Sequence, residues 1–226
     1  MGTKKKKSIY GDRDPREIPA YPVFEAARYL GLPEAKLRSW VGGKPGFSPV
    51  IRLPEMSEGQ LSFYNLVEAF VILGLRTRHG LSLQRVRTTV RFLSSLAPHS
   101  PHPLAELDLS TFARDVYFAG DKLVNVSRGG QLGIDQILAP VLERVEKDIR
   151  GVARLYPFTR PQIGTSPKVV VIDPEIAFGR PVIAGSGIPT SVIRDRWKAG
   201  ESVASLAEDY DRSKDEIEEA LRYEAA

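Results

Sequence analysis

The sequence contains no cysteine and no long apolar run, and both absences narrow what the protein can be. Without cysteine, the chain can hold no disulfide, no thiolate metal site and no cysteine nucleophile. No apolar stretch approaches the roughly 20 residues that span a membrane, and none follows the lysine run at 4–7 as the core of a secretory signal would. We therefore expect a cytoplasmic protein with no membrane contact.

Histidine is scarce, with three in the chain. His99 and His102 lie in the proline-rich segment 97–103, without a third histidine or a nearby carboxylate to complete a metal site. We interpret both as linker residues. No nucleophile, base and orienting group can be picked out together. The sequence therefore predicts no enzyme, no metal site and no cofactor.

Charge changes sign along the chain. Residues 1–103 carry 16 Lys and Arg against 8 Asp and Glu, residues 104–168 carry 9 against 8, and residues 169–226 carry 7 against 12. A basic surface neutralises phosphates, whereas an acidic surface is repelled by a duplex and suits a basic protein. A chain of 226 residues has room for two or three small domains, so we expect its two ends to hold different partners.

The segment 23–41 has the spacing of a helix-turn-helix. Its apolar positions give two short helices with a break at Gly31, which can take the left-handed conformation that ends a helix. The residues expected to face the core are Phe24, Ala27, Leu30, Leu37 and Val41. Lys36, Arg38 and Ser39 then remain for solvent or DNA, which makes the second helix the candidate recognition helix.

Further secondary structure is expected immediately downstream. The strand-like runs 50–53 and 60–63 predict a β-hairpin wing. Helices are predicted over 65–77 and, with Ser82 as the N-cap, over 83–96. The outer face of the second of these helices carries Arg85, Arg87 and Arg91.

Over residues 19–96 this arrangement resembles the DNA-binding domain of MerR-type regulators, a winged helix fold. The resemblance rests on Glu25-Ala26-Ala27, Leu30-Gly31-Leu32, Leu37-Arg38-Ser39-Trp40, Leu81-Ser82-Leu83 and Val86-Arg87. It implies that Arg38 and Trp40 touch the DNA backbone and that Arg52 in the wing contacts a phosphate. The alternative is a small three-helix core without DNA, and the basic exposed faces weigh against it. The predicted DNA-binding residues are Arg28, Lys36, Arg38, Ser39, Trp40, Lys44 and Arg52.

The middle of the chain, residues 97–168, is predicted to be a linker, a strand hairpin with a tight turn at 119–121, and an amphipathic helix. This helix is expected from Ile137 to Val152, where it would either pack in the core or form a dimer contact. Its apolar stripe consists of Ile137, Leu138, Val141, Leu142, Val145, Ile149 and Val152.

Residues 169–226 predict two short strands and three helices, over 191–198, 203–210 and 214–224. Ser213 and Glu216 form a capping box for the last helix. The stretch resembles a small domain-of-unknown-function family that recurs in prokaryotic toxin–antitoxin loci, including antitoxins of the VapB type. The resemblance rests on Asp173-Pro174-Glu175-Ile176, Phe178-Gly179-Arg180-Pro181-Val182-Ile183, Gly185-Ser186-Gly187-Ile188-Pro189 and Ala199-Gly200-Glu201-Ser202.

The resemblance implies that this C-terminal domain, itself helix-turn-helix-like, binds a toxin of the PIN-like ribonuclease class. The acidic last helix opposes DNA contact and favours a basic protein surface. The predicted partner-binding residues are Phe178, Arg180, Ile188, Trp197, Asp215 and Glu219.

The sequence thus predicts a mainly α fold with short β-hairpins. A flexible basic leader (1–18) precedes a winged helix-turn-helix domain (19–96), a middle segment (97–168) and a three-helix C-terminal domain (169–226). The predicted function is that of a homodimeric type II antitoxin, which represses its own operon through double-stranded operator DNA and neutralises a ribonuclease toxin. The alternative is a MerR-like ligand-sensing transcription regulator, which would need an apolar pocket with a few polar groups.

Overall fold

The computed structural model describes residues 10–43, 48–55, 57–78, 81–96, 98–106, 116–119, 122–125, 139–160 and 166–225. The helices are α1 (Val23–Tyr29), α2 (Glu34–Val41), α3 (Phe63–Arg78), α4 (Leu83–Leu96), α5 (Pro103–Glu106), the 3-10 turn η2 (Ala177–Gly179), α8 (Thr190–Lys198), α9 (Val203–Asp209) and α10 (Lys214–Ala225). The strands are β1 (Val116–Ala119), β2 (Lys122–Asn125), β3 (Val145–Asp148), β4 (Gly151–Leu155), β5 (Val170–Val171) and β6 (Val182–Ile183).

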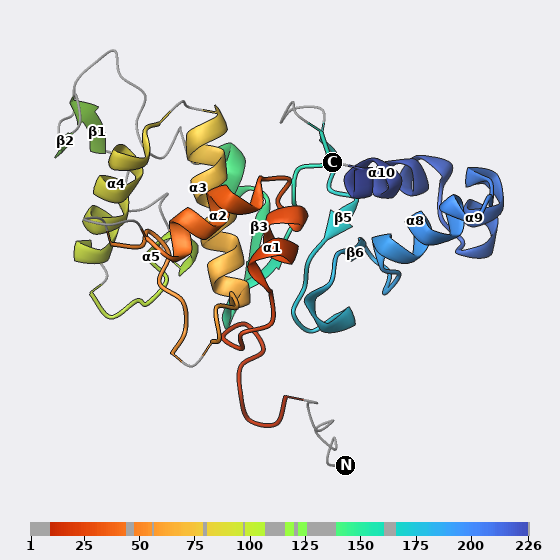
Figure 1. Ribbon diagram of the computed structural model, residues 1–226, viewed down its shortest axis with the longest axis horizontal. Coiled ribbons are helices and arrows are strands. Elements are labelled where there is room, and N and C mark those ends of the chain that lie inside the picture. The colour runs from red at the N-terminus through yellow and green to blue at the C-terminus, as the bar shows by residue number, and fades with distance from the viewer. Residues whose placement is uncertain are drawn as a thin grey trace.

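Each strand pairs with its neighbour in the chain, so the described residues form three two-stranded antiparallel sheets, β1–β2, β3–β4 and β5–β6. The predicted class, mainly α with short hairpins, is confirmed (Figure 1). The strand pair expected around residues 119–121 is also confirmed, because Ala119 opposes Lys122 across β1 and β2.

Helix α3 lies at the centre of the larger core. Every residue from 61 to 72 is buried, and α1, α2, α4, α5 and the β3–β4 hairpin contribute side chains to the same cluster. Val141, Val152 and Leu155 belong to this cluster too. The predicted winged domain and middle segment therefore share one core, and we call α1–α5 with β3–β4 the N-terminal body.

A second, smaller core holds the C-terminal domain, which we define as residues 166–225. It consists of Ile183, Ile193, Leu206, Ala207, Ile217 and Ala220. The three predicted helices are confirmed, and so are their caps. Ser202 Oγ accepts the N–H of Ser205, and Glu216 Oε2 accepts the N–H of Ser213 at 2.8 Å in the capping box.

The helix-turn-helix is confirmed in its local geometry, with α1 and α2 separated by Gly31 at φ 63°. Positive φ is accessible to glycine without the clash that a Cβ would make. Ala27, Leu30 and Leu37 are buried as expected. Phe24, which was expected in the same stripe, is instead exposed on α1.

The predicted β-hairpin wing at 50–53 and 60–63 is wrong. The N–H groups of Val50 and Ile51 donate to the carbonyl oxygen of Trp40, and Leu61 forms an isolated bridge with Tyr21. Helix α3 begins at Phe63, so the second strand-like run is divided between that bridge and the first turn of the helix.

The predicted amphipathic helix from Ile137 to Val152 is also wrong. Among the described residues, helix occupies only 139–142, and the chain then forms the β3–β4 hairpin. Val145 and Val152 face the core from its two strands, while Ile149 is fully exposed at the turn. The two buried valines fit a hairpin as well as a helical stripe, and Gly151 at φ 117° favours the turn.

Part of the predicted flexible leader is packed. Tyr10 Oη donates to the carbonyl oxygen of Pro174 at 3.0 Å. Arg16 is buried, pairs with Asp14, and donates from Nη1 to the carbonyl oxygen of Arg150 at 2.7 Å. Residues 10–18 therefore join the leader to the β3–β4 turn and to the C-terminal domain, whereas the lysine run at 4–7 lies outside the described residues.

His102 is not a linker residue. It is buried, its Nδ1 lies 3.2 Å from Oε2 of Glu68 in α3, and its ring stacks on Tyr64 with centroids 4.9 Å apart. Burial raises the pKa of the Glu68 carboxyl, while the hydrogen bond from His102 opposes that rise. This polar contact fixes the chain before α5 against α3.

One prediction tests the shared core. Gly74 of α3 lies against Val141, where an added Cβ would clash with both Cγ atoms of the valine. Gly74→Ala in a helix interior ordinarily stabilises by about 1 kcal/mol, but here overpacking should lower the free energy of unfolding by about 1–3 kcal/mol. Urea unfolding is the measurement.

Adding Val141→Ala provides the control, because it removes the two Cγ atoms that clash. Gly74→Ala should then cost less than it does in the parent chain, a coupling that a double-mutant cycle detects. A Gly74→Ala variant that is more stable than the parent would contradict the packing of residue 141 on α3.

Candidate functional site

The exposed face of α2 presents the polar residues that the sequence predicted. Arg38 projects into solvent, and Lys36 and Ser39 are half-buried. Ser39 Oγ donates to the carbonyl oxygen of Lys36 at 2.7 Å. Arg38 pairs with Glu34 one turn earlier, and both side chains are largely exposed. Such a pair contributes at most about 1 kcal/mol, so a phosphate can replace Glu34 at little cost.

Trp40 does not belong to this face, which corrects the predicted DNA contact. Its side chain is 1% exposed in the large core. Its carbonyl oxygen accepts the N–H groups of Val50 at 2.8 Å and Ile51 at 3.1 Å. The resemblance to MerR-type regulators implied a DNA contact for this indole, but the 3.6-residue helical period places it beside Leu37 and Val41 on the buried side of α2. Trp40 therefore positions α2 and the chain after it.

Arg52 extends this basic surface beyond α2. Its side chain is exposed, and its carbonyl oxygen accepts a 3.0 Å hydrogen bond from Nδ2 of Asn65, a buried residue of α3. The loop that carries Arg52 is therefore held on the core although it forms no wing. Lys44, another predicted contact, lies outside the described residues.

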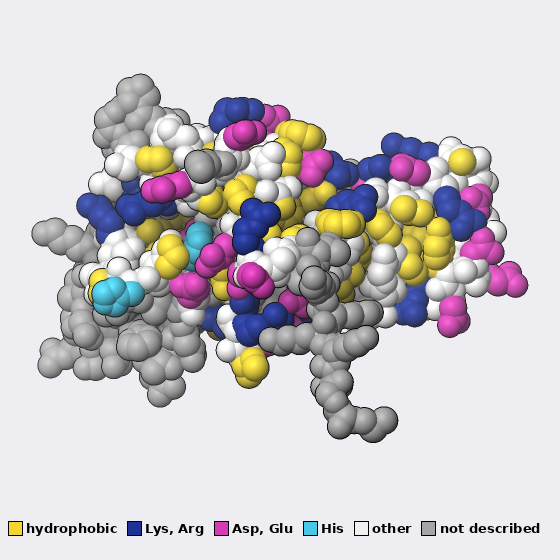
Figure 2. All heavy atoms as spheres, turned by 90° about the horizontal axis from the view of Figure 1, so that it is seen from below, with side chains coloured by type: hydrophobic (Ala, Val, Ile, Leu, Met, Phe, Trp, Pro, Cys, Tyr) yellow, Lys and Arg dark blue, Asp and Glu magenta, His cyan; other side chains and the backbone are white. Residues whose placement is uncertain are grey.

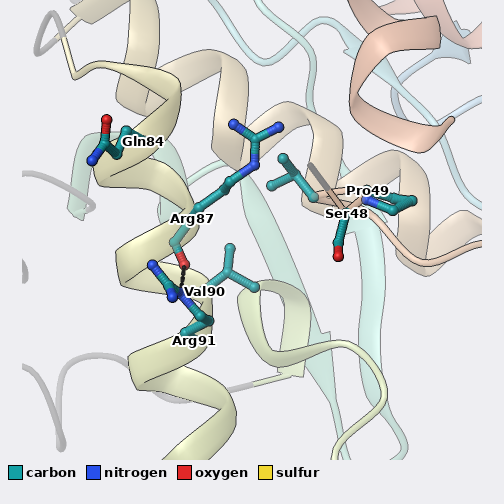
Figure 3. A pocket seen from close by; sticks show the side chains of 7 residues that line it. Ser48, Pro49, Gln84, Arg87, Val90 and Arg91 are labelled. Carbon is teal, nitrogen blue, oxygen red and sulfur yellow. Dashed lines mark hydrogen bonds between the residues drawn. The ribbon is translucent and has the colours of Figure 1, made fainter. Parts of the chain in front are cut away.

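A cleft of about 580 Å³ opens between α4 and residues 48–50. Figure 3 shows Arg87 extending from α4 toward Ser48 and Pro49, with Arg91 one turn further along the helix. The lining residues are Ser48, Pro49, Val50, Gln84, Arg87, Val90 and Arg91. The arginines were recognised from the sequence as the outer face of a helix, but the cleft was missed because its other wall is a loop without a pattern.

Arg28 is held by the C-terminal domain. Its Nη1 lies 3.1 Å from Oε2 of Glu224 in α10, and its guanidinium lies over the ring of Tyr29. The same carboxylate accepts hydrogen bonds from Thr190 and Arg194 of α8. We call this group, Arg28 with Thr190, Arg194 and Glu224, the Glu224 node. Because Arg28 is paired within the Glu224 node, it is less available to DNA than a predicted DNA-binding residue should be.

A second contact supports the Glu224 node. Tyr223 of α10 is buried and donates from its hydroxyl to the carbonyl oxygen of Tyr29 at 2.9 Å. Helix α10 therefore lies against α1, the first helix of the helix-turn-helix, as Figure 1 shows.

The C-terminal domain exposes two large apolar side chains that the sequence predicted as contacts. Phe178 is 65% exposed on η2, and Trp197 is 49% exposed on α8. Ala177 and Phe178 both have positive φ, at 48° and 57°, a conformation that is costly outside glycine. The neighbouring Gly179 leaves no room for a Cβ, which would clash with Oη of Tyr21. The chain is thus held in a conformation that turns Phe178 outward.

The remaining predicted contacts divide between surface and interior. Arg180 and Asp215 are exposed, and Ile188 is half-buried against the smaller core. Glu219 is 1% exposed and pairs with Arg160 and Arg222. Burial acts to raise the pKa of Glu219, but hydrogen bonds to Arg160 and Thr159 lower it overall. Glu219 is therefore an internal ion-pair residue, which corrects its assignment to the partner surface.

Acidic side chains gather at the end of the molecule formed by α9 and α10 (Figure 2). The exposed acidic residues there are Glu208, Asp209, Asp211, Asp215 and Glu218. Within the described ranges, no group of three or more potential ligands is arranged to hold a metal ion. No helix in those ranges is long and apolar enough to cross a membrane.

Comparison with known proteins finds relatives over most of the chain. A Mycobacterium tuberculosis H37Rv protein named "Putative antitoxin VapB45" is 29% identical, and the match covers 91% of this chain and 93% of the relative. A second protein of that strain, named "Uncharacterized protein Rv2308", is 24% identical, with 92% and 90% covered. Neither name is that of an enzyme.

The crystal structure of Rv2018 from Mycobacterium tuberculosis is similar in fold, with a TM-score of 0.65 at 25% identity, covering 91% of this chain and 98% of that one. At family level, residues 170–223 match "Protein of unknown function (DUF433)". The matched range runs from β5 to α10, so the part of this chain that is similar to the DUF433 family is its C-terminal domain.

Proposed function

We propose that this protein is an antitoxin that binds operator DNA through its N-terminal body and a ribonuclease toxin through its C-terminal domain. The observation that carries the proposal is the similarity to VapB45, which spans both parts of the chain instead of the C-terminal domain alone. The antitoxin role named for that relative thus applies to the same two-part architecture.

The DNA-binding part of the proposal rests on α2 and the loop after it. Lys36, Arg38 and Arg52 supply cations from α2 and the loop after it. The carbonyl oxygen of Trp40 accepts two backbone N–H groups of this loop, and the side-chain amide of Asn65 donates to the carbonyl oxygen of Arg52, so the backbone of the loop is held in place. A fixed backbone limits the conformational entropy that is lost when these side chains bind phosphates. As a homodimer, the protein would place two such surfaces on half-sites about one helical turn apart and repress its own operon.

The protein-binding part rests on the exposed surface of the C-terminal domain. Phe178 and Trp197 are large side chains of the kind that dominate protein interfaces. The acidic residues of α9 and α10 would meet the basic cleft by which a PIN-like ribonuclease holds RNA. The same acidic surface is unsuited to DNA, so the two binding functions are assigned to different parts of the molecule.

The DNA surface is tested with Arg38→Ala and Arg52→Ala. Each removes one phosphate contact, so the affinity for a duplex of the protein's own promoter should fall. The plot of log association constant against log salt concentration should become less steep, its negative slope shrinking in magnitude by about 1. Fluorescence anisotropy over a salt series measures both. Lys198→Ala on α8 also removes an exposed cation and should leave both values unchanged.

Trp40→Phe separates core packing from DNA contact. It should lower the free energy of unfolding while the folded variant binds DNA as the parent does. If Trp40→Phe had the stability of the parent but a much lower affinity for DNA, Trp40 would be a DNA contact and not a core residue.

The partner surface is tested by co-expressing the chain with the reading frame beside its gene. Phe178→Ala or Trp197→Ala should weaken the complex by about 30-fold, as truncation of an interface anchor does, as measured by isothermal titration calorimetry. Phe24→Ala is the matched control, because it removes an exposed aromatic from the N-terminal body and should have no effect. Equal losses from Phe24→Ala and Phe178→Ala would refute the assignment.

A further inference from the structure

We infer that the cleft between α4 and residues 48–50 binds a small organic anion with an apolar body. At about 580 Å³ the cleft has the size of a small-molecule site. This inference goes beyond the proposed function, which requires no such ligand, and it places a site in the N-terminal body and not in the C-terminal domain.

The chemistry of the lining selects the ligand class. Val50, Val90 and Pro49 provide an apolar wall, and Gln84 provides an amide that can both donate and accept. Arg87 and Arg91, on successive turns of α4, both line the cleft. Arg87 extends toward residues 48–50, while Arg91 lies along the helix and donates from Nε to the carbonyl oxygen of Arg87 at 3.4 Å (Figure 3). Guanidinium groups match the planar geometry of carboxylate and the charge of sulfonate or phosphate.

Polar anions without an apolar part would use the arginines alone. Organic anions with a flat hydrocarbon body would also cover the apolar wall. The burial of the apolar surface of both the wall and the ligand would then add to the binding free energy. None of the described residues that line the cleft is a carboxylate, so none of these side chains opposes the charge of an anionic ligand. The combination favours an aromatic or alicyclic acid over inorganic phosphate.

The site is joined to the proposed DNA surface by the backbone. Val50, in the cleft wall, donates its N–H to the carbonyl oxygen of Trp40 at 2.8 Å, and Arg52 lies two residues further along. A ligand seated against Val50 therefore bears on the segment that connects α2 to Arg52. If the segment has one position in the free protein and another with ligand bound, the ligand changes the affinity for DNA by the ratio of its own affinities for these two positions.

The test uses 8-anilinonaphthalene-1-sulfonate, a fluorescent aromatic anion, titrated into the full chain. We expect saturable 1:1 binding that Arg91→Glu and Gln84→Glu each weaken about tenfold or more. The matched control for Arg91→Glu is Arg85→Glu. It makes the same charge change on the same helix, outside the cleft, and should weaken binding less than twofold. Phe24→Ala controls for dye bound at an exposed aromatic and should leave the dissociation constant unchanged.

Inorganic sulfate serves as the competitor without an apolar body. The competitor with an apolar body is 1-naphthoate. If sulfate displaces the dye only at far higher concentration than 1-naphthoate does, the site prefers an organic anion. If both displace it at the same concentration, the site is a simple anion site and the inference is overturned. Equal weakening by Arg85→Glu and Arg91→Glu, or binding that does not saturate, would also overturn it. Circular dichroism establishes that each variant is folded. Since the readout contains no DNA, its failure and a failure of the proposed DNA binding are separate results.

Discussion

The burial of α3 is the constraint on which the N-terminal body depends. Twelve consecutive residues, 61–72, are buried, so the helix must be covered on all sides. Helices α1 and α2, which precede α3 in the chain, and α4, α5 and the β3–β4 hairpin, which follow it, supply that cover. A buried carboxylate, Glu68, makes the requirement stricter, because it needs the hydrogen bonds that His102 and Asn65 provide. The basic surface is formed by the outer sides of these covering elements.

The Glu224 node determines how the second domain is attached. Glu224 is buried at the junction and binds one cation from α1 and another from α8. An unpaired carboxylate at this position would be costly, which ties the first helix of the helix-turn-helix to the C-terminal domain. The net charge nevertheless differs between the two ends of the chain, because residues 1–103 carry 16 Lys and Arg against 8 Asp and Glu, and residues 169–226 carry 7 against 12. Exposed cations lie on α2, α4 and residue 52, and exposed carboxylates gather on α9 and α10 (Figure 2).

Local signals were sufficient to predict most helices. Gly31, the N-cap Ser202 and the capping box at Ser213 each act within a few residues, and all are found as expected. What the sequence could not reveal depends on contacts far apart in the chain. His102 is explained only by Glu68, 34 residues earlier, and Glu219 only by Arg160, 59 residues earlier. The β3–β4 hairpin was mistaken for a helix because short amphipathic segments fit both periods.

Hydrogen–deuterium exchange of the full chain, with and without a duplex of its own promoter, would show which part of the molecule DNA covers. DNA should slow exchange in α2 and residues 50–53, while α9 and α10 should exchange as in the free protein. Slower exchange confined to α9 and α10, with α2 unchanged, would contradict the division of the molecule into a DNA-binding body and a protein-binding domain.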